Sequence, residues 1–176
     1  MLENDQIVLR AVEPTDIDYL YQLENNADLW HFGNTIEPYS RFVIKNFIIR
    51  AQKDIYTTKQ LRLIIGCKST NQPIGAIDLF DFDPYHNRAG VGIVIDKKEN
   101  RHQGFAEQAL RLIIDYSFNF LHLHQLYCTI AADNLPSIKL FTKCGFVQCS
   151  TYKEWRFNGD KYIDELGFQL IANKND

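Results

Sequence analysis

Three consecutive β-type runs occupy the middle of the chain, and its most regular amphipathic helix follows them. The runs cover 61–67, 74–82 and 88–95, and turn residues at 69–73 separate the first two, as in a hairpin. From 104 to 120 the apolar residues recur at three-and-four spacing, which indicates an α-helix with one buried stripe. This change of period predicts a mixed α/β (α+β) domain.

The flanking segments extend the same pattern. A short strand at 7–11 precedes a helix-start cluster at 13–16, and a second helix after the irregular stretch 30–39 is capped by Ser40. We expect the apolar side of that second helix to consist of Phe42, Val43, Phe47 and Ile48.

The carboxyl-terminal third predicts two strands around a helix and then a final hairpin. A buried strand at 126–131 precedes a helix that Asn134 caps and Gly145 ends. Asn158 and Gly159 then join strand-like runs at 146–157 and 161–170, which is a strong hairpin signal. The order β, α, α, three β, α, β, α, β, β predicts a largely antiparallel central sheet.

Length and charge limit the classes of function. A chain of 176 residues suits one domain with a real core, so we expect a single domain over 1–176. The net charge of -3 offers no basic excess for nucleic acid. Because the chain shows neither a membrane-spanning run nor a signal-peptide pattern, we expect no membrane partner and a cytoplasmic location.

The cysteines and histidines do not indicate a metal site. The four cysteines form no C-x-x-C pair, and the five histidines lack ligand spacing. We therefore expect buried, reduced thiols and no structural metal.

The segment between the third β-type run and the regular helix is a candidate anion site. A polar turn at 96–100 leads into 101–106, where Gly104 lies at the helix start. A helix start of this kind directs free backbone N–H groups and the positive end of the helix dipole at one point, which suits a pyrophosphate. A single glycine at a helix start is a weak signal by itself, because many helices begin this way and ordinary capping explains the same residues.

Several motifs in this order resemble the GNAT family of N-acetyltransferases. The resemblance rests on R-x-x-G-x-A at 101–106, on the strand at 73–79 and on the block at 134–146, and it covers nearly the whole chain. It is nearest to the branch that holds spermidine and ribosomal-protein N-terminal acetyltransferases. It implies the acyl-CoA N-acyltransferase fold, with a mostly antiparallel seven-stranded sheet flanked by about four helices.

The resemblance implies acetyl transfer from acetyl-CoA to a primary amine. The implied cofactor-binding residues are Gly92, Ile93, Val94, Arg101, His102, Gln103, Gly104, Phe105, Ala106, Asn134 and Lys143. Two of them have alternatives: Asn134 as a helix N-cap, and Lys143 as the cation that neutralises a helix C-terminus. A backbone N–H near Ile93 or Val94 is the candidate donor to the developing oxyanion.

The chain departs from the family pattern at both proton-transfer positions. Phe141 replaces the tyrosine that is taken to protonate the thiolate, and Gly90 replaces a glutamate of the spermidine enzymes. Tyr127, Tyr152 and Cys144 are the possible substitute acids. The candidate bases are Asp78, Asp81, Asp83 and His86, and strict alternation would place Asp81 and Asp83 on one face and Asp78 on the other. We therefore predict Asp78, Asp81 and Tyr127 as catalytic residues.

The acceptor is expected to be cationic. Glu24, Asp28, Glu37 and Asp83 would form a negative substrate-binding region for a polyamine or diamine, and a protein N-terminal amine fits as well. Trp30, Phe32 and Tyr39 could line either kind of site. The competing interpretation is a catalytically weak CoA-binding sensor or scaffold, which the missing acid and base favour. A homodimer is possible by analogy.

Overall fold

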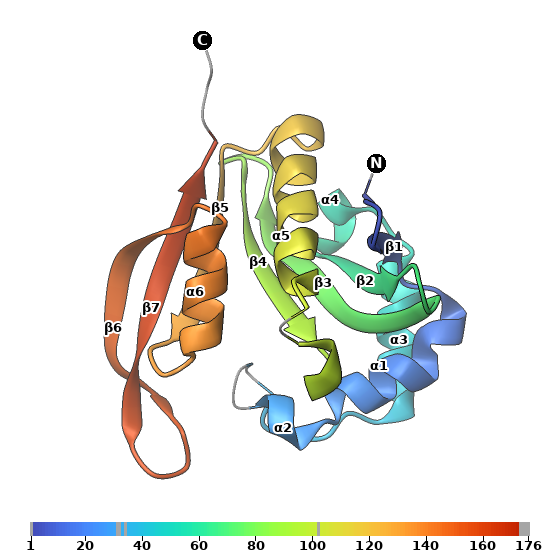
Figure 1. Ribbon diagram of the computed structural model, residues 1–176, viewed down its shortest axis with the longest axis horizontal. Coiled ribbons are helices and arrows are strands. Elements are labelled where there is room, and N and C mark those ends of the chain that lie inside the picture. Colours follow the sequence, from blue (N-terminus) through green and yellow to red (C-terminus); the bar gives the residue numbers. More distant parts are fainter. Residues whose placement is uncertain (1, 31–32, 34, 102, 173–176) are drawn as a thin grey trace.

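The computed structural model describes residues 2–30, 33, 35–101 and 103–172. Its strands form one seven-stranded sheet in the order β1-β2-β3-β4-β5-β7-β6, in which only the β4–β5 pair is parallel (Figure 1). The predicted mixed, mostly antiparallel sheet is thus confirmed. The strands are β1 (Ile7–Ala11), β2 (Leu61–Cys67), β3 (Gln72–Asp83), β4 (Arg88–Ile95), β5 (Gln125–Ala131), β6 (Val147–Phe157) and β7 (Tyr162–Ile171).

Four helices of eight residues or more flank the sheet in the described part of the chain. They are α1 (Ile17–Glu24), α3 (Arg41–Ala51), α5 (Phe105–Asp115) and α6 (Leu135–Lys143). The shorter helical segments are η1 (Pro14–Asp16), α2 (Ala27–Trp30), α4 (Ile55–Thr58), η2 (Lys98–Asn100) and the π-helical turn η3 (Tyr116–Phe120). No described helix has both the length and the apolar character needed to cross a membrane.

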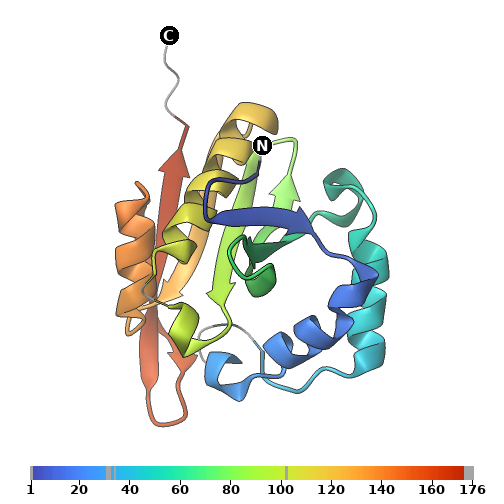
Figure 2. The same ribbon diagram turned by 45° about the vertical axis from the view of Figure 1, so that its right-hand side comes forward.

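The helices cover the two faces of the sheet unequally. Residues of α5 and α6 share one buried cluster with β1–β5 and β7, and residues of α1 and α3 share a second cluster with β2 and β3 (Figures 1 and 2). The second cluster contains no buried residue of β5, β6 or β7. Within the described residues, the face of those three strands opposite α5 and α6 therefore has no helical cover.

Local sequence signals explain the helix boundaries. The Ser40 side chain accepts a hydrogen bond from Val43 N, which caps α3 as predicted. The predicted apolar side of α3 is only partly right. Phe42 is 70% exposed and Val43 is also exposed, whereas Ile44 and Ile48 are buried against α1 and the sheet. Ile44 and Ile48 lie four residues apart and define the buried face of α3, and Phe42 and Val43 lie off that face.

The carboxyl-terminal hairpin forms at the predicted residues. The Asn158 side chain accepts hydrogen bonds from the backbone N–H groups of Asp160 and Lys161, and Gly159 has a φ of 96°. The hairpin connects β6 to β7, but β7 inserts between β5 and β6 and leaves β6 at the sheet edge.

Candidate active site

Strands β4 and β5 separate in the middle of the sheet. They pair only through Arg88 with Gln125, Ala89 with Leu126 and Gly90 with Tyr127. Beyond this point β4 keeps its partners on β3 but has no partner on β5 among the described residues, and Figure 1 shows the two strands moving apart. The backbone edge of β4 at 91–95, which includes the predicted Gly92, Ile93 and Val94, is thus open to a ligand.

Helices α5 and α6 both begin after the carboxyl ends of this separated pair. Gly104, the N-cap of α5, has a φ of 81°, a left-handed conformation that glycine adopts without strain. The atom nearest to a Cβ placed there is Gln108 Nε2, at 3.7 Å. The backbone at the helix start is therefore accessible, which fits the predicted pyrophosphate site.

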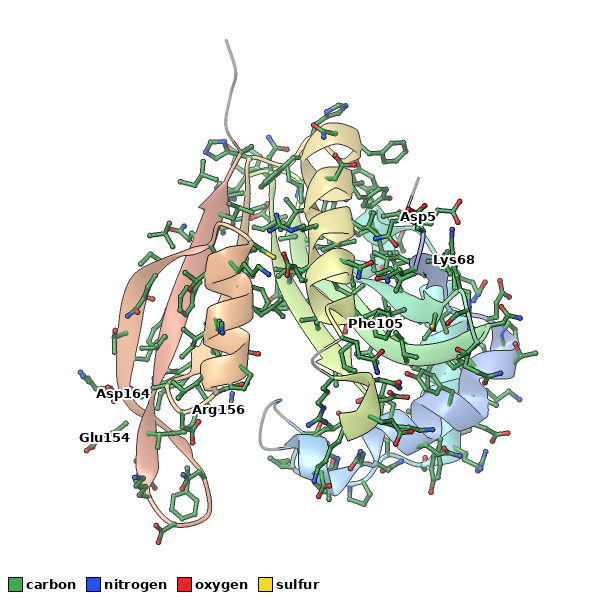
Figure 3. The ribbon with its side chains drawn as sticks, viewed as in Figure 1. Asp5, Lys68, Phe105, Glu154, Arg156 and Asp164 are labelled. Atoms are coloured by element: carbon green, nitrogen blue, oxygen red, sulfur yellow. The ribbon has the colours of Figure 1, made fainter. Side chains whose placement is uncertain are left out.

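The other predicted cofactor residues surround this helix start. Within the described ranges the half-buried Arg101 side chain makes no ion pair, and the exposed Gln103 side chain donates to Glu99 O at 2.6 Å. Phe105 and Ala106 form the first turn of α5, where Figure 3 labels Phe105. His102 lies outside the described residues.

Asn134 and Lys143 mark the two ends of α6. Asn134 is its N-cap, and the side-chain oxygen accepts a hydrogen bond from Ser137 N at 3.3 Å. Lys143 Nζ lies 2.6 Å from Glu107 Oε2, in the first turn of α5. Lys143 thus joins the two helices and does not stand free at the helix C-terminus.

Phe141, at the position of the family tyrosine, lies in the core. Its side chain is 3% exposed, and its ring contacts Phe146 edge to face with 5.0 Å between centroids. Without a hydroxyl, this ring can neither donate nor accept a proton. A general acid, where the reaction uses one, comes from another residue.

A cavity of about 610 Å³ opens beside the point where β4 and β5 separate. It contains two of the predicted acids together with two tyrosines. The lining residues are Asp81, Asp83, Arg88, Gln125, Tyr127, Cys128, Thr129, Cys149, Ser150, Tyr152, Gly167, Phe168 and Gln169.

A β-bulge places Asp81 in this cavity. The pairing of β3 with β4 shifts between Phe80 and Asp83, and Asp81 has a φ of 48°. Asp81 is the extra residue, and Phe82 is buried on the α5 face. Asp81 and Asp83 line the same cavity, as predicted, but the prediction that Asp78 lies on the opposite face is wrong, because the bulge breaks the alternation. The Tyr127 hydroxyl donates to Asp81 Oδ2 at 3.4 Å. Burial and the charge of Asp81 together raise the pKa of Tyr127, which keeps the phenol protonated.

Asp83 is held by its own loop and by cations. Its Oδ1 accepts hydrogen bonds from the N–H groups of Tyr85 and His86, and its Oδ2 lies 2.7 Å from His86 Nδ1 and 3.3 Å from Arg88 Nη2. The backbone and side-chain hydrogen bonds of His86 lower the pKa of Asp83 to about 2. Asp81, in contrast, has no cationic partner among the described residues.

Phe80 occupies the space of the missing glutamate. Its ring lies over Gly90, and three ring atoms lie 2.2 to 2.7 Å from where a Cβ at position 90 would be. The same ring contacts Tyr127 edge to face, with centroids 6.0 Å apart. Gly90 is therefore needed for Phe80 to cross β4 and pack against Tyr127.

Asp78 and Glu24 are both bound to Arg62. Arg62 holds Asp78 through two hydrogen bonds, Nε to Oδ1 at 2.7 Å and Nη2 to Oδ2 at 2.8 Å, and its Nη1 bonds Glu24. Both oxygens of Asp78 are thus engaged by a guanidinium, unlike those of Asp81. We refer to Glu24, Arg62 and Asp78 as the ionic triad.

The remaining predicted acceptor residues lie apart from the larger cavity. Asp28, on α2, and Glu37 are exposed and do not line it. Trp30 Nε1 donates to Glu24 O at 2.8 Å, and Tyr39 lines a second cavity of about 230 Å³ together with Glu24 and Arg62. Phe32 lies outside the described residues.

Three charged residues with specific partners were not predicted from the sequence. Arg62 lies within an otherwise apolar β2, and the buried Glu165 of β7 pairs with Arg156 at 3.2 Å. Arg156, on the β6–β7 hairpin in Figure 3, also donates to Gly33 O in the segment after α2. A lone charge inside a strand-like run was the available signal for Arg62.

The described residues include no cluster of three or more side chains that could hold a metal ion. All four cysteines are free thiols, and Cys67, Cys128 and Cys144 are buried while Cys149 is exposed. The expectation of buried thiols is thus right for three of the four.

Comparisons with known proteins agree with this geometry. The model of the acetyltransferase (GNAT) domain family matches residues 6–147. A spermidine N(1)-acetyltransferase from Vibrio cholerae is 29% identical over 97% of this chain and 96% of the relative, and one from Escherichia coli is 30% identical over 87% and 80%.

The solved structures give the same result. A crystal structure of spermidine N-acetyltransferase from Vibrio cholerae in complex with CoA and spermine superimposes with a TM-score of 0.84 at 27% identity, and the match covers 96% of each chain. A dodecameric structure of that enzyme superimposes with a TM-score of 0.80 at 26% identity, over 98% of this chain and all of the other. The separated β4 and β5, the open helix start and the matching family model together place the chain in the GNAT family of acetyl-CoA-dependent N-acetyltransferases.

Proposed function

We propose that this enzyme transfers the acetyl group of acetyl-CoA to a primary amine of a polyamine or diamine. The observation that carries the proposal is the cavity beside the β4–β5 separation, where Asp81 has no cationic partner among the described residues and two tyrosines supply aromatic surface. Carboxylates and aromatic rings together favour a cationic amine. The spermidine acetyltransferases among the relatives support the same class of acceptor.

The cofactor residues are proposed from the open backbone of the same region. The β4 edge at Gly92, Ile93 and Val94 would hold the pantetheine arm, and 101–106 with the start of α5 would hold the pyrophosphate. Bound acetyl-CoA supplies the activated acetyl group. Asn134 and Lys143 border this region from α6, and Asn134 already has a structural role as the N-cap.

Asp81 and Tyr127 are proposed as the proton-transfer pair. Asp81 accepts the proton of the acceptor ammonium, and Tyr127 donates its own proton to the sulfur that leaves. Tyr127 then regains a proton from Asp81 through the hydrogen bond that joins them. The nitrogen of the tetrahedral adduct releases its one excess proton to water as the amide forms, so Asp81 and Tyr127 end in their starting protonation states. Asp78, with both oxygens bound by Arg62, is the weaker candidate base.

The first test measures the release of CoA thiol with spermidine as the acceptor. Tyr127→Phe and Asp81→Asn should each lower kcat by about a hundredfold or more, because each removes one partner of a general acid–base pair. Tyr85→Phe, an exposed tyrosine on the neighbouring loop, is the matched control and should retain full turnover. Tyr152→Phe tests the other phenol in the cavity.

The outcomes separate the alternatives. Turnover with spermidine that survives both substitutions would refute the proposed roles of Asp81 and Tyr127. Turnover with peptides but with no polyamine would identify a protein N-terminal amine as the acceptor. Tight CoA binding without turnover on any amine would support the sensor or scaffold function that Phe141 suggests.

We also propose that the chain self-associates. Strand β6 is a sheet edge with exposed Val147, Trp155 and Phe157, and exposed apolar edges favour association. The dodecameric Vibrio cholerae enzyme supports assembly beyond a dimer.

A further inference from the structure

The ionic triad is an enclosed set of charges. The side chains of Glu24, Arg62 and Asp78 are 22%, 17% and 15% exposed, and the Arg62 guanidinium also lies 5.0 Å from the centre of the Phe47 ring. Burial by itself would lower the pKa of Arg62, but the charges of Asp78 and Glu24 outweigh burial and raise it. The guanidinium is therefore a permanent positive charge, and the triad carries a net charge of about -1 when both carboxylates are ionised.

The position of the triad connects it to the reaction. Arg62 of β2 pairs with Asp78 of β3, and Asp78 in turn pairs with Gly92 of β4. Gly92 begins the open edge proposed above for acetyl-CoA. Side chains of directly paired residues lie on the same face of a sheet, so Asp78 and Arg62 lie on the face opposite α5 and next to that edge. The second cavity, of about 230 Å³, borders Glu24 and Arg62 on this side.

Two acidic regions therefore flank Phe80. On one side Asp81 has no cationic partner among the described residues, and on the other side two carboxylates share one arginine. Without Arg62, the second region would offer two carboxylates and the aromatic rings of Tyr39 and Phe47 to a cation. Arg62 occupies that position as an internal cation.

We propose that Arg62 is a specificity-determining residue, whose fixed charge limits the preference of the enzyme for acceptors that carry additional positive charges. This inference rests on the proposed function, because it assumes a cationic amine acceptor in the cavity of Asp81 and Tyr127, across Phe80 from the triad. A structural clamp between α1 and the sheet is the competing explanation. The two differ in a measurable way, because a clamp depends on the contacts of Arg62 whereas specificity depends on the charge of the triad.

The test varies the charge of the triad separately from the clamp. Arg62→Met gives a triad charge of about -2, Asp78→Asn gives about 0, and the double variant Arg62→Met with Asp78→Asn returns it to about -1 without the arginine. Arg62→Lys keeps the charge with fewer hydrogen bonds. The acceptors are spermidine and the monoamine n-butylamine, and every variant is assayed at the same pH.

The readout is the preference ratio, kcat/KM for spermidine divided by kcat/KM for n-butylamine. Arg62→Met should raise the ratio about tenfold, and Asp78→Asn should lower it about tenfold, because one charge near the site acts more strongly on the more highly charged amine. The double variant and Arg62→Lys should stay within about threefold of the unaltered enzyme. A loss of kcat common to both amines cancels in the ratio.

Three outcomes would overturn the inference. They are a double variant that shifts as far as Arg62→Met, a ratio that is the same in all variants, and an Asp78→Asn ratio that does not fall. If Arg62→Met does not fold, the comparison of Asp78→Asn with Arg62→Lys still tests the inference. Asp78→Asn must lower the preference ratio, and Arg62→Lys must leave it unchanged. Circular dichroism verifies the fold of each variant.

Calorimetric binding of the same two amines separates this inference from the proposed function. If the unaltered protein acetylates neither amine, the proposed function fails, and the ratio of the two dissociation constants still tests Arg62 in the same direction. If acetylation of spermidine is normal but the ratio does not follow the triad charge, the inference fails and the proposed function stands.

Discussion

Gly90 shows how one residue can change the chemistry of a site through its neighbour. The absence of a glutamate at this position is evident from the sequence, but its structural consequence is not. The Phe80 ring fills the space, contacts Tyr127 and separates the ionic triad from Asp81. The absence of the glutamate is thus accompanied by an aromatic ring at the same place, and Asp81 is the carboxylate that the Tyr127 hydroxyl contacts.

Gly90→Ala should destabilise the protein by about 1–3 kcal/mol, because the added methyl group overlaps the Phe80 ring. Urea unfolding followed by circular dichroism measures the change. Gly92→Ala is the matched control, because a Cβ there would lie 3.7 Å from the nearest Phe80 atom, at ordinary contact distance. Equal losses of stability in the two variants would contradict this account of the packing.

At the scale of elements, the β3 bulge and the start of α6 place the polar groups of the site. The bulge turns Asp81 toward Tyr127 and places Phe82 in the core. One inserted residue therefore allows the core to pack while a carboxylate lines the cavity. Helix α6 begins where β5 ends, and Asn134 fixes its first turn. The same asparagine lies beside the proposed cofactor region, which leaves a second role to test.

Asn134→Ala should cost about 1 kcal/mol of stability, because the N–H of Ser137 loses its acceptor. Asn134→Ser should retain most of the stability, since serine is also a good N-cap. Thermal unfolding measures this effect, and the KM for acetyl-CoA is measured on the same samples. If serine restores stability but KM rises in both variants, Asn134 also contacts the cofactor. If serine is as unstable as alanine, the cap assignment is wrong.

At the scale of the whole molecule, the sheet is covered on one face by α5 and α6 and only half covered on the other by α1 and α3. The uncovered half consists of β5, β7 and β6, and it contributes most of the lining of the larger cavity. The Arg156 bond to Gly33 joins this half to the segment after α2. Strand β6 remains an exposed edge.

Light scattering during gel filtration should give a mass well above the 20.5 kDa of one chain, because the exposed apolar residues of β6 favour a partner. Trp155→Glu should shift the population toward the monomer. Phe120→Glu, a substitution of a comparably exposed aromatic residue on η3, serves as the control and should leave the mass unchanged. A monomeric mass for the unaltered protein would refute self-association.

The sequence by itself determined the strands and the longer helices, and it supplied the prediction of the cofactor region. Periodicity, the Ser40 and Asn134 caps, and the Asn158–Gly159 turn are local signals, because they depend on backbone propensities and hydrogen bonds within a few residues. Gly104 and the R-x-x-G-x-A motif at 101–106 are also local signals, because they too involve only a few neighbouring residues. These features predicted the order of strands and helices, and the resemblance that they carried predicted the family.

Only the tertiary structure decided which charges are available for chemistry. Asp78, Asp81 and Asp83 lie within six residues and look alike in the sequence, yet Arg62 binds the first, Tyr127 contacts the second, and His86 with Arg88 holds the third. Arg62 and Tyr127 come from other strands, and the bulge that changes the face depends on the pairing of β3 with β4. The physical reason is that the availability of a charged group is set by partners brought together by folding, over distances in sequence that no local pattern records.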